Sequence, residues 1–139
     1  MAPLATMGML ALAGGAGAVA RFLVDWGLEA AGRLPGGGHF PVSTMAVNVS
    51  GAFLAGAVAG ALATGALSPS LGSAASVGFL GAFTTFSTWM VQIVDLWEGG
   101  ERRSALLHLL GSLAAGVTAA ALGLMLVVSL GVAPLGSQP

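Results

Sequence analysis

The sequence predicts an all-α membrane protein, built as one domain of four transmembrane helices over residues 1–139. Hydrophobic residues make up 56% of the chain and charged residues only 6%, and the mean hydropathy is +0.95. A soluble domain of this length would have too few charged side chains to cover its surface. Glycine, with 23 residues, is common in membrane helices because it lets them approach closely. The absence of cysteine excludes disulfides and thiolate metal sites.

Four apolar runs supply the helices, because each is long enough for the roughly 20 residues that span a bilayer. The first twenty residues contain no Lys or Arg, so they lack the basic segment of a signal peptide and predict a retained helix. Gly and Pro predict turns within 27–40 and 65–69, and the third loop, 98–103, is charged. The predicted helices cover residues 4–26, 41–66, 71–97 and 104–132.

The third predicted helix contains a run of hydroxyl side chains that follows Gly81. Such residues compete with the helix for backbone hydrogen bonds or lose rotamer freedom in it, so the run predicts a helix that breaks at mid-membrane. Free carbonyls and amides at that depth are tolerated only in buried backbone or beside a cavity, and they are suited to ion sites. The hydroxyl residues of this run are Thr84, Thr85, Ser87 and Thr88.

Arg21 and Asn48 are polar residues near the end of the first helix and inside the second. An arginine in a membrane segment is costly and usually faces protein or water, which makes Arg21 a functional candidate. Equally, Arg21 can extend to the interface or pair with Asp25 one turn later. The Asn48 amide can donate to an anion, but taken alone, a hydrogen bond between helices is the commoner role.

Four further residues each have a functional and a structural interpretation. Phe86 has a ring whose electropositive edge can face an anion, although packing is commoner. Ser112 and Thr118 can extend a line of donors or bond to carbonyls of their own helix. His108, near the start of the fourth helix, is more often an interfacial hydrogen-bonding residue than a ligand. No nucleophile–base pair or metal-ligand cluster is evident, so we do not expect an enzyme.

At this point the chain resembles the Fluc, or CrcB, fluoride channels over roughly residues 14–124. The third-helix motif is the most specific, and all four motifs occur in the family's order. They are Gly14 to Arg21; Pro41, Thr44, Val47-Asn48, Gly51 and Phe53; Gly78-Phe79, Gly81 and Thr84 to Thr88; and Ala105, Ser112 and Gly116.

The resemblance implies an antiparallel, dual-topology dimer in the cytoplasmic membrane, with two narrow fluoride pores at its interface. Such channels export fluoride passively and so reduce its toxicity. A structural sodium ion that is not transported would be held by backbone carbonyls, here those of Gly81 and Thr84. Arg21 would attract anions, and Phe86 would be one of two pore phenylalanines. The donors to the ion would be Asn48, Ser87, Thr88, Ser112 and Thr118.

The sequence departs from the family pattern at two positions. Trp89 stands where the second pore phenylalanine is expected; it is bulkier and adds an indole N–H, so we expect it to narrow or re-tune the pore. His108 stands where the family usually has tyrosine. Because histidine titrates near neutral pH, we hypothesise that conduction varies with pH, an idea that equal conductance at pH 6 and 8 would exclude.

Two alternatives remain. Arg33, Arg102 and Arg103 all lie in the first and third loops, a charge bias that favours one orientation and hence one subunit of a heterodimeric fluoride channel. The second alternative is a small four-helix multidrug exporter. That class needs a buried carboxylate in its first helix, whereas Asp25 and Glu29 come too late. A membrane scaffold without transport would leave the third-helix motif unexplained.

Overall fold

The computed structural model of the chain describes residues 2–30 and 40–131, and every regular element in those residues is helical. Four spans there are long and apolar enough to cross a membrane: Leu4–Leu28, Val42–Ala63, Pro69–Glu98 and Arg102–Ser129. The four predicted apolar helices are therefore confirmed, with ends that differ from the predicted ones by at most three residues. Arg33, one of the residues of the predicted charge bias, lies outside the described residues.

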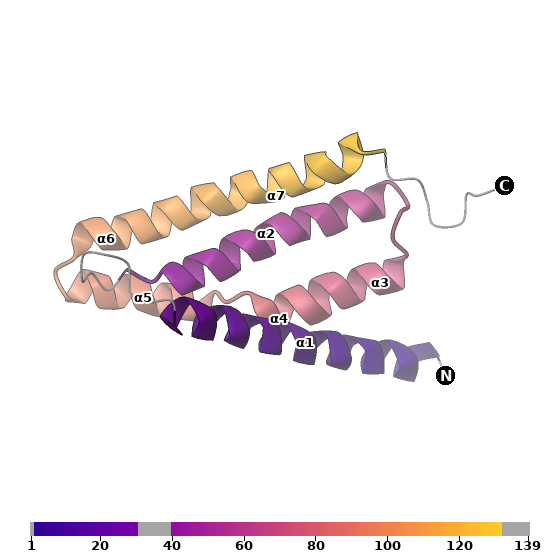
Figure 1. Cartoon of the computed structure of the whole chain (residues 1–139), viewed down its shortest axis with the longest axis horizontal. Helices are drawn as coiled ribbons and strands as arrows, with labels where there is room; N and C mark the ends of the chain where they lie inside the picture. The colour runs from indigo at the N-terminus through magenta and orange to yellow at the C-terminus, as the bar shows by residue number, and fades with distance from the viewer. Residues whose placement is uncertain (1, 31–39, 132–139) are drawn as a thin grey trace.

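The spans divide into shorter elements, two of which are π-helical (η1 and η2). In chain order they are α1 (Ala2–Ala30), α2 (Val42–Ala63), α3 (Pro69–Ser73), η1 (Ala74–Leu80), α4 (Gly81–Phe83), α5 (Ser87–Glu98), α6 (Arg102–Leu106), η2 (Leu107–Gly111) and α7 (Ser112–Ser129). The four spans alternate in direction, so α1 begins and α7 ends at the same end of the bundle (Figure 1). Along the bundle α2 packs against α7, while α1 packs mainly against η1 and α4.

The turns between spans use glycine where the backbone requires it. Gly65 has φ of 73° after the end of α2, and Gly100 has φ of 82° after α5, a left-handed conformation that other residues rarely adopt. Helix α3 then begins with Pro69 in its first turn and with Ser68 as N-cap, whose hydroxyl accepts from the Leu71 N–H at 3.4 Å. The turns after α2 and α5 are therefore both short.

Close contact between α2 and α7 depends on glycines without side chains. A Cβ at Gly56 would collide with the Ala120 carbonyl group of α7, and one at Gly123 would collide with the Phe53 carbonyl group of α2. The two helix backbones therefore touch, as membrane helices do where small residues face each other.

Two small clusters form the buried core. One consists of Val47, Leu80 and Phe83, and the other of Ile93, Leu96 and Ala105. Most large apolar side chains are outside both clusters: Leu12, for example, is 79% exposed. Such an apolar surface is unsuited to water and suited to lipid, so the chain is a multi-pass membrane protein.

Candidate functional site

The third span has three residues, 84–86, outside any helix, between the end of α4 at Phe83 and the start of α5 at Ser87. Thr84 is extended, with φ of −86° and ψ of 164°. Its N–H and its hydroxyl both donate to the Leu80 carbonyl, at 3.0 and 2.8 Å. Because this oxygen takes both donors, Thr84 closes the last turn of α4 and directs the chain away from the helix axis.

Asn48 of α2 binds the backbone of Thr85 at two points. Its Nδ2 donates to the Thr85 carbonyl at 2.8 Å, and its Oδ1 accepts from the Thr85 N–H at 2.9 Å. The half-buried amide thereby satisfies both polar groups of a residue that has left the helix. The hydrogen bond between helices considered for Asn48 is thus present, directed to backbone.

Arg21 of α1 binds the first turn of α5, directly after this segment. Its Nη2 donates to Thr88 Oγ1 at 3.1 Å, and Thr88 Oγ1 also accepts from Thr85 Oγ1 at 3.0 Å. Arg21 Nε is 3.8 Å from Asp25 Oδ2, and both side chains are partly exposed, so this ion pair contributes little stability. A hydroxyl accepts two hydrogen bonds and donates one. The Thr88 proton is therefore left for another acceptor.

An open groove of about 590 Å³ adjoins residues 84–86 and is lined by α2, α7 and the third span (η1, α4 and α5). Its wall is mostly apolar, with a few polar side chains. Six of the predicted site residues line it: Gly81, Thr84, Asn48, Phe86, Trp89 and Ser112. Phe86 is 71% exposed, so its ring is available at the groove.

An aromatic row leads from the groove into the bundle. The Phe86 and Trp89 rings meet edge to face with centroids 5.7 Å apart, and the Trp89 and His108 centroids are 6.4 Å apart. The Trp89 indole N–H donates to the His108 carbonyl at 3.3 Å. The indole N–H, which phenylalanine would lack, is therefore hydrogen-bonded to the backbone of η2.

His108 is fully buried and its ring stands edge-on to that of Phe40, with centroids 5.4 Å apart. Its Nδ1 lies 3.4 Å from Ser112 Oγ, and its Nε2 has no hydrogen-bond partner. Ser112 is thus a groove residue whose hydroxyl binds the ring of His108. His108 does not itself line the groove, but it contacts Ser112 and Trp89, which do.

The structure separates the remaining predicted residues from the groove wall. Ser87 is exposed at the start of α5, and Arg21 and Thr88 lie beyond the wall. The Thr118 hydroxyl donates to the Ala114 carbonyl of its own helix at 2.8 Å, as in the structural interpretation offered for it.

Comparison with known sequences assigns the chain to a family. The sequence model of a family described as "CrcB-like protein, Camphor Resistance (CrcB)" matches residues 8–124. The chain belongs to the CrcB family. A Symbiobacterium thermophilum protein named "Fluoride-specific ion channel FluC 1" is 44% identical over 119 residues, which are 85% of this chain and 94% of that protein.

Other members of the family are as similar. A Leifsonia xyli protein with the same printed name is 41% identical over 139 residues, 100% of this chain and 97% of its own. "Fluoride-specific ion channel FluC 2" of Mycobacterium tuberculosis is 44% identical over 112 residues, 81% of this chain and 82% of its own. The resemblance to the CrcB family drawn from the motifs is therefore confirmed.

The sodium ion that the resemblance implies would be held by the carbonyls of Gly81 and Thr84, and the state of these carbonyls shows whether they suit it. In a continuous helix, the Thr85 N–H would donate to the Gly81 carbonyl and the Thr88 N–H to that of Thr84. Here Asn48 Oδ1 takes the first N–H at 2.9 Å, and Thr85 Oγ1 takes the second at 3.3 Å. Both carbonyls lose their helical donors, and carbonyl oxygens suit a hard cation, so the residues fit the ion.

Sequence reasoning missed one member of this site. Thr85 receives Asn48 on its backbone and connects to Thr88 through its hydroxyl, whereas the sequence indicated it only as one of several hydroxyl residues and not as a site residue of its own. The sequence pointed to Thr85 only through its place among the hydroxyl residues after Gly81. Its partner Asn48 lies 37 residues earlier in the chain, and no local pattern indicates that the two residues pair. The pairing of Arg21 with Thr88, 67 residues apart, is equally invisible to a local pattern.

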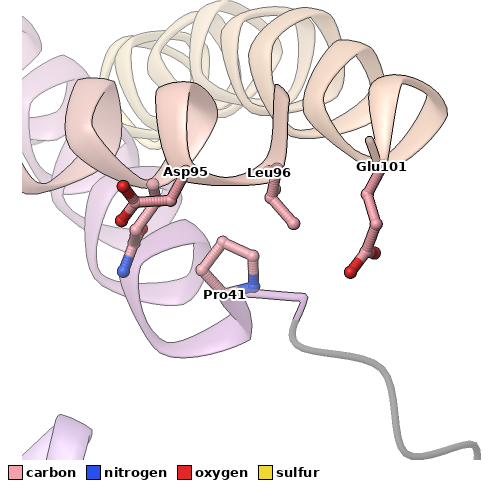
Figure 2. A pocket seen from close by; sticks show the side chains of 5 residues that line it. Pro41, Asp95, Leu96 and Glu101 are labelled. Atoms are coloured by element: carbon pink, nitrogen blue, oxygen red, sulfur yellow. The ribbon is translucent and has the colours of Figure 1, made fainter. Parts of the chain in front are cut away.

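A second cavity, of about 460 Å³, contains none of the predicted site residues. Asp95 and Glu101 lie on either side of Leu96 above Pro41 (Figure 2), and Gln92 Oε1 is buried there without a partner. The two carboxylates make this cavity unfavourable for an anion. The groove at residues 84–86 is therefore the better candidate for anion chemistry.

Proposed function

We propose that the chain is a fluoride channel of the cell membrane that exports the ion passively and so limits its toxicity. The observation that carries the proposal is the non-helical segment 84–86, which brings the exposed Phe86 to an open groove. The CrcB membership and the names of the relatives, all fluoride-specific channels, support transport and not an enzymatic reaction.

The donors around the segment explain how a strongly hydrated anion would lose its water. Arg21 supplies positive charge from beyond the groove wall and donates to Thr88, which also accepts from Thr85. Phe86 offers the electropositive edge of its ring. Ser112 adds a hydroxyl at the groove. Charged and neutral donors placed in a site with little water bind an anion more strongly than they would in bulk solvent.

The groove is one-sided, and a second copy of the chain in antiparallel orientation would close it. In this arrangement two grooves would form two pathways, and segment 84–86 would lie at mid-membrane. The lining supports close contact, because Gly51, Ala52 and Gly116 are small. A structural sodium ion would be held by the carbonyls of Gly81 and Thr84 from each copy. Its positive charge would balance the partial negative charges of the carbonyl oxygens that converge there.

Efflux from liposomes tests this function. The chain alone is reconstituted in vesicles loaded with potassium fluoride, valinomycin is added, and fluoride release is followed with an electrode. Release of fluoride, with none from matched chloride vesicles, is the expected result. If the chain alone releases no fluoride, Trp89→Phe separates two causes. Rescue means that Trp89 closes the pathway of the homodimer, whereas no rescue contradicts the homodimer and indicates a missing homologous partner.

A further inference from the structure

Asn48 makes contacts that reach beyond Thr85 itself. The bond from the Thr85 N–H to Asn48 Oδ1 acts on the peptide unit that joins Thr84 to Thr85. That unit also contains the Thr84 carbonyl, and no peptide bond described here is cis. In a planar trans peptide the C=O and N–H point in opposite directions. Fixing the N–H on Asn48 therefore fixes the Thr84 carbonyl, directed away from Asn48.

The same bond determines the state of a second carbonyl. In a continuous helix, the Thr85 N–H would donate to the Gly81 carbonyl. With Asn48 in place, the Thr85 N–H donates to Asn48 Oδ1 at 2.9 Å and therefore does not donate to the Gly81 carbonyl. One side chain thus acts on both carbonyls that the sodium proposal uses.

Other contacts restrain Thr84 but leave its carbonyl available. Its N–H and hydroxyl bind the Leu80 carbonyl, and its methyl group lies against Gly51 of α2, where a Cβ would collide with it. Gly51 is three residues after Asn48 on the same helix. Helix α2 therefore holds Thr84 at two points: the peptide unit between Thr84 and Thr85, and the Thr84 side chain.

We propose that Asn48 is a positioning residue for the structural sodium ion: it frees the Gly81 carbonyl, aims the Thr84 carbonyl and does not itself bind the metal. This inference rests on the sodium ion of the proposed function. The hydrogen bond to Asn48 also polarises the Thr84 carbonyl, because bonds in a chain strengthen one another. Residues that orient metal ligands in this way change metal affinity by about 10- to 100-fold when they are lost.

The test is the sodium dependence of the melting temperature in detergent micelles, with N-methylglucamine replacing sodium at constant ionic strength. For the wild type we expect a saturable rise with sodium. For Asn48→Ala we expect the midpoint of that rise to move to about 10- to 100-fold higher sodium. Ser76→Ala is the matched control: it changes a polar groove residue whose hydroxyl binds Gly72, and its midpoint should be unchanged.

A third variant identifies the atom responsible and covers the case in which the alanine variant fails to fold. Asn48→Asp keeps an oxygen acceptor for the Thr85 N–H and loses the donor, so it should keep the wild-type midpoint or bind sodium more tightly. A wild-type midpoint in Asn48→Ala, or an aspartate variant as weak as the alanine one, would overturn the inference. If the wild type shows no sodium response while fluoride efflux persists, both this inference and the sodium ion fail, and the channel function stands.

Discussion

The α2–α7 pair and the segment around residues 84–86 are held together by different means. In the pair, two regular helices touch through glycines, and the backbone of each lies where a side chain of the other would be. Around 84–86 the helix stops, and side chains from α1 and α2 bind its backbone and hydroxyls instead. The first region is stabilised by packing and the second by hydrogen bonds over long sequence separations.

The difference indicates which property a mutation in each region should affect first, stability or ion handling. Backbone contact leaves no room for a larger residue, so mutations between α2 and α7 should reduce stability first. The hydrogen-bonded segment exposes polar groups toward an open groove, so mutations there should alter ion handling more than stability. Four predictions, from the largest expected effect to the smallest, test this division.

Gly56→Ala should give the largest loss of stability. Its methyl group would collide with the Ala120 carbonyl group, and because backbone cannot move aside as a side chain can, the helices must separate. We expect a loss of about 1–3 kcal/mol in the free energy of unfolding, measured by titrating the protein in dodecyl maltoside with SDS. Gly8→Ala is the matched control, since a Cβ there meets nothing within 4 Å. Equal stabilities for the two variants would contradict the packing account.

Arg21→Gln should chiefly reduce fluoride flux. Glutamine keeps donors for Thr88 but removes the charge, and favourable charge raises the rate at which ions enter by about tenfold or more. We expect a loss of that order in liposome efflux at low ionic strength, and a smaller one at high ionic strength. Asp25→Asn, which removes the partner of Arg21, should not reduce flux. A loss equal in both variants would assign the effect to the ion pair.

Trp89→Phe should have a modest effect on stability. The indole N–H to His108 is lost, but the His108 carbonyl still accepts from the Ser112 N–H, so no buried group is left unsatisfied. A loss of about 1 kcal/mol is expected, with fluoride selectivity retained. Increased flux without loss of stability would show instead that the indole ring narrows the pathway.

Thr118→Val should have the smallest effect. The exposed Thr118 hydroxyl binds its own helix, so stability should change by no more than about 0.5 kcal/mol, and efflux should be that of the wild type. Thr88→Val is the comparison, because it breaks the network of Arg21 and Thr85 and should lower efflux. A strong loss in Thr118→Val would place this residue in the pathway, as the family resemblance implied.

The sequence predicted the four helices because each depends on a local property, a long apolar run with Gly or Pro beside it. It also directed attention to the hydroxyl residues after Gly81, where residues 84–86 are non-helical in the structure. The depth of that segment in a membrane, the dimer and the sodium ion stay predictions. So does the pH dependence attributed to His108.

The partners of the site residues could not be predicted, because they depend on how the helices pack. Asn48 was expected to serve an anion or another helix, and the sequence did not indicate that it would bind both polar groups of one peptide backbone. The two π-helical stretches, and with them the position of the His108 carbonyl beside Trp89, have no recognisable local signal. Thr85 gained its role only through these contacts.

The most direct test of the central claim is the ion selectivity of the chain by itself. The purified protein is fused into a planar bilayer with fluoride on one side and chloride on the other, sodium on both sides, and the reversal potential is measured. A reversal potential far from zero, of the sign expected when fluoride permeates in preference to chloride, is the result we predict. Reversal near zero would mean that the groove does not distinguish the two anions, and it would contradict the proposed function.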